Sequence, residues 1–250
     1  MLKVLRIKLP YIIPFLLFFV MIKIEDKALR DKVVEYLQQF LTENRQDRLK
    51  EVLGMRTRHV TVVLEDLFQA QNISAVLRTC DCYGIQDVHV IKHRNEFEAN
   101  KEISMGADKW LSIHEYPHSE HNVKDCIDYL HKQGYWVAAT LPDERKRTIF
   151  DLPIEQKTAF LFGTELTGLS EEAIRYADGN VLIPMYGFTE IFNISNSAAI
   201  ILSHFSERIR HSAVKWQLSD DEKEEIYFDW LQKSVKDPDG LIDYYMKHLI

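Results

Sequence analysis

The sequence predicts an α/β fold with a mostly parallel sheet and helices on both of its faces. Short β-branched and apolar runs, such as 60–64 and 158–162, are typical of strands that are buried on both faces. Segments with helical periodicity alternate with these runs, as they do in strand–helix–strand units. The chain of 250 residues, 46% hydrophobic and 28% charged, is long enough to bury a substantial core.

The segment 21–58 is predicted to be a small, charged helical extension. Within 26–41, large side chains recur at helical spacing, namely Leu29, Val33, Tyr36, Leu37 and Phe40. Thr42 is a suitable N-cap for a second helix that reaches about residue 53, where Gly54 ends it.

The α/β domain is expected at 59–212, with C-terminal helices at 213–250. Its predicted strands are 60–64, 87–91, 135–140, 158–162 and 180–183. Its predicted helices are 72–83, 121–132, a helix that Ser170 caps and that ends at 176, and 193–210. The C-terminal helices are predicted at 220–234 and 240–249. Ligands of such sheets bind beyond the carboxyl ends of the strands.

An apolar leader at 1–20 precedes these elements. Its basic start and apolar run resemble a signal peptide, but Pro10 and Pro14 interrupt the run and no small-residue cleavage site follows. The run is also shorter than the ~20 residues of a spanning helix. We expect a leader that is disordered or non-native, with Met21 as the true start, and no stable membrane association. The alternatives are a membrane-contacting tail and an export signal.

Composition excludes several kinds of protein. The three cysteines, Cys80, Cys82 and Cys126, form neither a disulfide framework nor a paired zinc motif, and they indicate a reducing, cytoplasmic environment. No histidine spacing indicates a metal site. The net charge of −7 is unfavourable for nucleic-acid binding, but basic residues are segregated into clusters at 45–59, 92–94 and 145–147.

Common nucleotide and hydrolase motifs are absent from the sequence. Gly163 and Gly168 have the outer spacing of a phosphate loop, but Leu169 and Ser170 replace the required Lys and Ser or Thr. A dinucleotide G-x-G-x-x-G and a hydrolase G-x-S-x-G are also missing.

Three segments contain candidate functional residues. The first, 71–80, has Asn72 at a helix start and Arg78 nearly two turns later, so the two could share a face. A half-buried arginine there would need an anionic partner. The second, 160–170, places Glu165 in a two-glycine loop between a strand and a helix. The third runs from the strand end at Ile183 and Pro184 to Asn193 and a helix rich in small residues. Taken singly, each segment could equally be structural.

Together, the three segments resemble the motifs of the TrmH family of SPOUT methyltransferases. The motifs are N-x-x-A-x-x-R, F-G-x-E-x-x-G-[LV]-S and I-P-M-x-G followed by N-[IV]-S, and the resemblance covers about residues 45–210. The resemblance implies a sheet with a C-terminal deep trefoil knot, a homodimer, and transfer of a methyl group from S-adenosyl-L-methionine to a ribose 2′-hydroxyl without a metal. The most similar branch modifies guanosine 18 in the D-loop of tRNA.

The resemblance also implies roles for particular residues. Arg78 would act on the 2′-hydroxyl, Asn72 would orient Arg78 or the ribose, and Glu165 and Asn193 would fix the loops and the polar end of the cofactor. The implied cofactor-binding residues are Thr140, Leu141, Gly163, Ile183, Met185, Gly187 and Phe192. The expected contacts to tRNA phosphates are Arg45, Arg48, Arg56 and Arg58.

Some residues depart from the family pattern. Ile191 stands where a serine is usual, Asn196 replaces an apolar residue, and the arginine pair after the last motif helix is displaced to Arg208 and Arg210. Two alternatives are therefore kept beside tRNA methylation: a ribosomal RNA 2′-O-methyltransferase and a non-catalytic RNA-binding relative.

Overall fold

The computed structural model describes residues 22–67, 69–95, 97, 99–142 and 147–248. The expected leader at 1–20, the basic residues Arg145 and Lys146, and residue 249 of the last predicted helix lie outside this part. Two compact units are present, one formed by Met55–Leu218 and the other by the chain up to Gly54 together with the chain from Ser219. Each unit is described separately.

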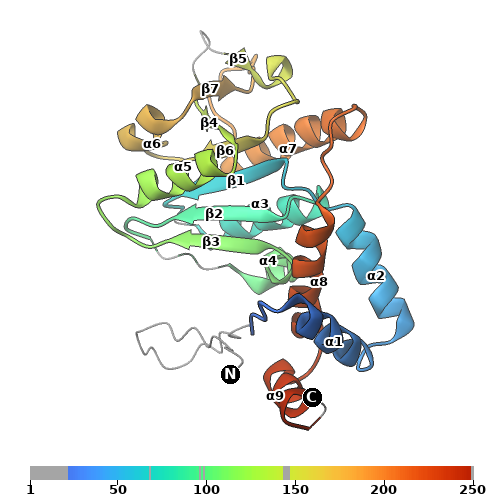
Figure 1. The fold of residues 1–250 in the computed structure, drawn as a ribbon. Helices are drawn as coiled ribbons and strands as arrows, with labels where there is room; N and C mark the ends of the chain where they lie inside the picture. Colours follow the sequence, from blue (N-terminus) through green and yellow to red (C-terminus); the bar gives the residue numbers. More distant parts are fainter. Residues whose placement is uncertain (1–21, 68, 96, 98, 143–146, 249–250) are drawn as a thin grey trace. The chain divides into compact units, whose positions relative to one another are not determined.

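The larger unit contains a seven-stranded sheet in which every pair of neighbouring strands is parallel (Figure 1). Its order is β3-β2-β1-β6-β4-β7-β5. The strands are β1 Val60–Glu65, β2 Asp87–Ile91, β3 Ser112–Tyr116, β4 Trp136–Thr140, β5 Arg147–Thr148, β6 Thr158–Phe162 and β7 Gly179–Leu182. The predicted α/β class with a parallel sheet is confirmed.

Helices cover both faces of this sheet (Figure 1). One face carries α3 (Ala70–Cys82) and α7 (Ile194–Arg210), which also pack against each other. The other face carries α5 (Asn122–Lys132) and α6 (Glu171–Tyr176). Shorter elements are α4 (Lys101–Ser104) and the 3-10 turns η1 (Ala107–Lys109) and η2 (Ile149–Asp151).

Two hydrophobic cores follow from this layering. Along β1, Val62 and Leu64 point into the core beneath α3 and α7, whereas Val63 between them joins the core beneath α5. Successive side chains of a strand point to opposite faces, so a strand covered on both sides is apolar at most of its positions. This explains why the central strands β1 and β6 consist mostly of apolar and β-branched residues.

The smaller unit is helical. Its elements are α1 (Lys27–Gln38), α2 (Glu43–Gly54), α8 (Asp220–Ser234) and α9 (Pro238–His248), and α8 packs against both α1 and α2. A capping box begins α8, because Ser219 accepts from the backbone N–H of Glu222 and the Glu222 carboxylate accepts from that of Ser219.

The strand register brings several loops to one edge of the sheet. Leu64 of β1 is level with Phe162 of β6, and Thr140 of β4 is level with Val181 of β7. The segments that follow these strands therefore leave the sheet side by side at its carboxyl edge.

Candidate functional site

A cavity of about 450 Å³ lies at this edge of the sheet. Three segments line it: residues 140–142 from the end of β4, residues 162–169 from the end of β6, and residues 181–183 and 185 from β7 onward. Further lining comes from residues 191 and 192 just before α7, from residues 194 and 197 in its first turn, and from Ile174. The volume is in the range of small-molecule sites, and the position is where parallel sheets bind their ligands.

Most of the residues expected to bind a cofactor line this cavity. They are Thr140, Leu141, Gly163, Ile183, Met185 and Phe192. The seventh, Gly187, is not among the lining residues, and a Cβ at this position would meet no heavy atom within 4 Å. The sequence therefore located the loops around the cavity, although Gly187 itself faces open space.

The loop after β6 is a tight hairpin that walls the cavity. Thr164 and Gly168 exchange two backbone hydrogen bonds of 3.1 and 3.0 Å. A Cβ at Gly163 would lie 2.3 Å from the backbone of Gly168 and Leu169, so only glycine is accommodated there. Gly168 has a φ of 70°, which also favours glycine. Glu165 lies at the tip of this hairpin and is exposed.

Three of the four predicted catalytic residues form one hydrogen-bonded cluster. Asn72 Nδ2, near the start of α3, donates to Glu165 Oε1 at 3.0 Å. Asn193 Nδ2 donates to Asn72 Oδ1 at 3.1 Å and also to Glu165 Oε1. Asn193 Oδ1 accepts from the backbone N–H of Ser195 at 2.9 Å, which makes this residue the N-cap of α7. The cluster therefore ties α3, the β6 hairpin and the start of α7 together.

Arg78 does not join this cluster. Six residues correspond to a rotation of about 600° at ~100° per residue, so Arg78 points about 120° away from Asn72 around α3. Its side chain is exposed, not buried or half-buried as the sequence suggested, and within the described part of the chain it has no hydrogen bond or ion pair. Because α3 buries Ile73, Val76, Leu77 and Cys80 instead, the expectation of a shared face for Asn72 and Arg78 is wrong.

The four arginines expected to contact RNA have different environments. Arg45 and Arg48 belong to α2, and Arg48 forms an exposed ion pair with Glu51 at 2.7 Å. Arg56, in contrast, is 1% exposed, pairs with Asp81 and donates to the Ile85 carbonyl at 3.1 Å.

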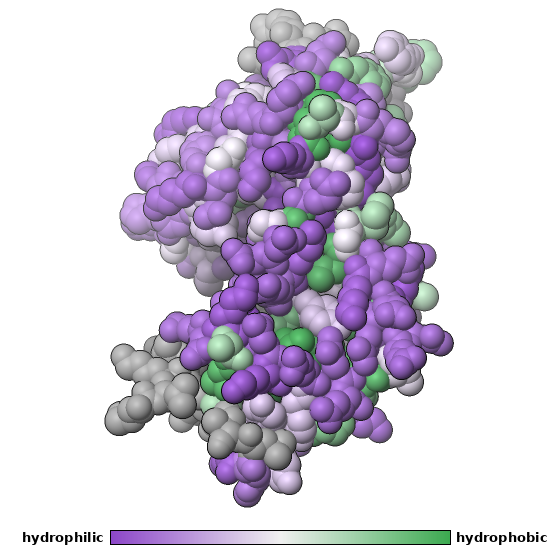
Figure 2. Space-filling view, turned by 45° about the vertical axis from the view of Figure 1, so that its right-hand side comes forward, coloured by the Kyte–Doolittle hydropathy of each residue, from purple (hydrophilic) through white to green (hydrophobic). Residues whose placement is uncertain are grey.

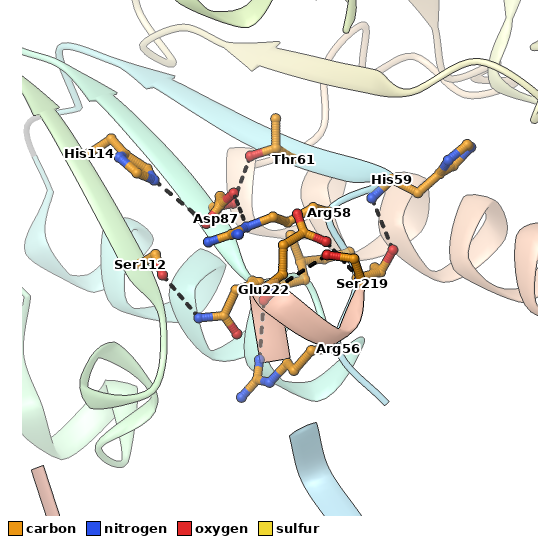
Figure 3. A network of polar contacts seen from close by, with 12 residues as sticks. Arg56, Arg58, His59, Thr61, Asp87, Ser112, His114, Ser219 and Glu222 are labelled. Carbon is orange, nitrogen blue, oxygen red and sulfur yellow. Dashed lines mark hydrogen bonds and ion pairs between the residues drawn. The ribbon is translucent and has the colours of Figure 1, made fainter. Parts of the chain in front are cut away.

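Arg58 also has a carboxylate partner. Its Nε lies 2.9 Å from Oδ2 of Asp87, which His114 approaches from the other side (Figure 3). These placements favour structural roles for Arg56 and Arg58.

Sequence reasoning missed a buried carboxylate next to the cavity. Glu65, the last residue of β1, is 2% exposed and accepts hydrogen bonds from Ser170, the N-cap of α6. The signal was present in the sequence, because an acidic residue ends an otherwise apolar strand whose carboxyl end points toward the ligand edge.

Two further findings concern metals and membranes. Among the described residues, no group of three or more His, Cys, Asp or Glu side chains could hold a metal ion. No helix in this part of the chain is long and apolar enough to cross a membrane.

On the face drawn in Figure 2, hydrophilic residues cover most of the surface and the apolar areas are small.

A parallel sheet with a cavity beyond its carboxyl edge and a polar cluster beside it is typical of α/β proteins that bind a small ligand. Residues 59–203 match the family described as the SpoU rRNA methylase family, and the chain belongs to this family. The resemblance that the three sequence motifs indicate is thereby confirmed.

Relatives of known activity or structure support this membership. A tRNA (guanosine(18)-2′-O)-methyltransferase of Borreliella burgdorferi is 38% identical over 205 residues, which are 82% of this chain and 92% of that protein. The crystal structure of the A. aeolicus TrmH/SpoU tRNA modifying enzyme has a TM-score of 0.70 at 26% identity and covers 78% of this chain and 98% of that one. The methyltransferase AviRb of Streptomyces viridochromogenes, solved with AdoMet, has a TM-score of 0.55 at 25% identity and covers 65% of each chain.

Proposed function

We propose that this protein transfers a methyl group from S-adenosyl-L-methionine to the ribose 2′-hydroxyl of guanosine 18 in tRNA. The observation that carries the proposal is the Asn72–Glu165–Asn193 cluster beside the cavity, because it joins residues from all three sequence motifs. The relative that is 38% identical has this activity by name and matches over nearly its whole length.

S-adenosyl-L-methionine would occupy the cavity at the carboxyl edge of the sheet. The loops there offer backbone groups and apolar side chains, with Thr140, Leu141, Gly163, Ile183, Met185 and Phe192 as the contacts. Gly187 would leave room for a ligand or a partner chain at the rim. The cofactor supplies an activated methyl group on a sulfonium, a good leaving group, so a metal is not required. In the cluster, Asn72 and Asn193 hold the Glu165 carboxylate in one orientation at the hairpin tip.

Arg78 would hold the RNA at the reacting ribose. A guanidinium stays protonated in proteins and presents five N–H donors in a planar fork, which suits a phosphate. Its exposure in the single chain leaves these donors available. The phosphate beside the ribose, or a water, then takes the 2′-hydroxyl proton as the oxygen attacks.

The active form would be a homodimer with a trefoil-knotted domain. Several large apolar side chains close to the cavity are exposed in the single chain, which supports a partner subunit covering them. They are Leu166, Tyr186, Phe188, Ile191 and Phe192. Arg78 lies outside the cluster of its own chain, so a dimer in which Arg78 completes the partner's site would bring the two together. The tRNA substrate and the free cysteines indicate a cytoplasmic location.

Methyl transfer from labelled S-adenosylmethionine to an unmodified tRNA transcript tests this function. A matched transcript with 2′-deoxyguanosine at position 18 and the variant Arg78→Ala serve as controls. We expect label on the wild-type transcript only, and a loss of about 100-fold or more for Arg78→Ala. Because Arg78 is exposed, this variant should keep its stability within about 0.5 kcal/mol.

Other outcomes would contradict the proposal in distinct ways. Equal label on both transcripts would exclude the guanosine 18 ribose as the acceptor. Transfer to ribosomal RNA alone would retain the chemistry and change the substrate. Cofactor binding without transfer to either RNA would favour a non-catalytic relative, in which Ile191 replaces the serine of the family pattern. In that case Ile191→Ser should restore transfer.

A further inference from the structure

Glu65 is a buried carboxylate whose two oxygens are both used. Oε2 accepts from the backbone N–H of Ser170 at 2.9 Å, and Oε1 accepts from the Ser170 hydroxyl at 2.6 Å. Oε1 also lies 3.0 Å from His93 Nε2. A carboxylate that is 2% exposed is stable only when hydrogen bonds replace its lost hydration, and here two side chains and one backbone N–H do so.

Ser170 connects this carboxylate to the wall of the cavity. It directly follows Gly168 and Leu169, which line the cavity and against whose backbone Gly163 is packed. Its hydroxyl donates to Glu65 and accepts from the backbone N–H of Ala173 at 3.0 Å, so Ser170 also caps α6. Glu65 thus holds the exact point at which the hairpin after β6 becomes a helix.

Asp66 holds His93, the second partner of Glu65, in place. Asp66 has a φ of 52°, and its Oδ1 accepts from the backbone N–H groups of His93, Arg94 and Asn95 at 3.1, 2.8 and 2.9 Å. Burial would raise the pKa of Asp66, but the N–H groups of Asn95, Arg94 and His93 outweigh burial and lower it. Asp66 therefore fixes the segment that carries His93, so His93 reaches Glu65 from a rigid support.

We propose that Glu65 is a positioning residue for the cofactor: it fixes Ser170 and thereby holds the Gly163–Ser170 hairpin in its binding conformation. The inference rests on the proposed function, because it takes the cavity to be the S-adenosylmethionine site. Glu65 does not line the cavity and does not belong to the Asn72–Glu165–Asn193 cluster, so it acts only through Ser170. Without it, the hairpin would still form its internal hydrogen bonds but would lose its attachment to β1.

The variant Glu65→Gln tests this inference against the matched control Asp87→Asn. Gln keeps the size of Glu65 but exchanges one acceptor oxygen for a donor, so it cannot accept from both groups of Ser170 and from His93. Asp87 is likewise a buried carboxylate, 8% exposed, but it begins β2 at the opposite edge of the sheet, beside Arg58 and His114 (Figure 3). Both substitutions remove a buried charge, and only one of them lies next to the hairpin.

Binding of S-adenosylmethionine is measured by calorimetry on the full chain, and kinetics with saturating tRNA follow. We expect Glu65→Gln to raise the Kd and KM for the cofactor by about tenfold or more. The hairpin would then have to become ordered when the cofactor binds, and the lost hydrogen bonds between Ser170 and the Glu65 carboxylate set the size of this cost. The kcat at saturating cofactor should stay within about threefold, and Asp87→Asn should change the Kd less than about twofold. In a Ser170→Ala background, Glu65→Gln should have a much smaller effect, since the two residues act in one chain of contacts.

Hydrogen exchange without cofactor provides an independent readout. Glu65→Gln should accelerate exchange in 163–170, whereas Asp87→Asn should not. An unchanged Kd for Glu65→Gln, or an equal loss of affinity in both variants, would overturn the inference. If the wild-type protein binds no S-adenosylmethionine, the proposed function fails. The exchange rates in 163–170 then decide whether Glu65 holds the hairpin.

Discussion

Asn72 and Glu165 are 93 residues apart in the sequence, and a hydrogen bond of 3.0 Å joins Nδ2 of the first to Oε1 of the second. Asn193 binds both of them through its own Nδ2. In this arrangement two amides donate to one carboxylate, so each amide must present its N–H₂ group and not its oxygen to Glu165. The cluster therefore requires an N–H donor at both Asn72 and Asn193.

The variant Asn193→Asp separates the two roles of Asn193. An aspartate still accepts from the Ser195 N–H, so the N-cap of α7 remains and stability should change by less than about 1 kcal/mol. It cannot donate, however, and it places a second carboxylate beside Glu165. We expect methyl transfer to fall by about 100-fold or more. Asn193→Ala is the comparison, because it also loses the cap; equal activity in Asn193→Asp and wild type would exclude the donor role.

The hairpin after β6 makes a second prediction, at Gly163. A Cβ there would lie 2.3 Å from backbone atoms of Gly168 and Leu169, which cannot move without opening the hairpin. Gly163→Ala should therefore weaken S-adenosylmethionine binding by at least about tenfold, as measured by calorimetry. Gly54→Ala, at the end of α2 with nothing within 4 Å of its Cβ, is the control and should bind as wild type does. Normal binding by Gly163→Ala would mean that the hairpin is not part of the cofactor site.

The sequence predicted the central strands and the long helices because their burial leaves a clear pattern. β1 and β6 are buried at every position, and their sequences, VTVVLE and TAFLF, consist mostly of apolar and β-branched residues. β3 was missed, because this edge strand is only partly buried and its sequence, SIHEY, mixes polar and apolar residues. β5 has two residues, which is too short for any periodicity.

The site was predictable where a motif places residues at element ends, and less so elsewhere. Asn72, Glu165 and Asn193 lie in segments that meet at the carboxyl edge of the parallel sheet, and hydrogen bonds join them there. The burial of Arg56 could not be read from its cluster of basic neighbours, because its partner Asp81 lies 25 residues away on α3. Long-range pairing of this kind depends on the tertiary fold and leaves no local pattern.

The two arginines of α2, Arg45 and Arg48, should respond differently to substitution from Arg56, which precedes β1. We expect Arg45→Gln together with Arg48→Gln to weaken tRNA binding and to reduce the slope of log K against log salt by about 0.7–0.9 for each lost phosphate contact. Arg56→Gln should instead lower the free energy of unfolding by about 1–3 kcal/mol, because the buried guanidinium loses its hydrogen bond to the Ile85 carbonyl and its ion pair with the partly exposed Asp81.

Filter-binding titrations over a range of salt concentrations, with urea unfolding in parallel, distinguish the two effects. A reduced salt slope for Arg56→Gln with unchanged stability would restore Arg56 to the RNA-binding surface. An unchanged slope for the α2 double variant would remove α2 from it.

The stability of the larger unit should depend on pH through His89. This side chain is 1% exposed, and Nδ1 lies 3.2 Å from the Tyr116 hydroxyl. His114 stacks on its ring at 4.7 Å, and Tyr129 and Asp87 lie nearby. Burial, with the charge of His114 as a smaller cause, lowers the pKa of His89 to about 3, although Asp87 acts in the opposite direction.

In the unfolded chain His89 takes up a proton below pH 6.5, but in the folded protein it does so only near pH 3. The unfolded state therefore binds more protons in this window, and stability falls as the pH is lowered, by about 1.4 kcal/mol per pH unit for one such group. His89→Asn keeps a polar group near Tyr116 and cannot be protonated, so its free energy of unfolding should fall less steeply between pH 6.5 and 4. Urea unfolding followed by tryptophan fluorescence measures the two slopes, with the exposed His118→Asn as control. Parallel slopes for wild type and His89→Asn would show that His89 is protonated in the folded protein. The conclusion that a neutral imidazole is buried between β2 and α5 would then be wrong.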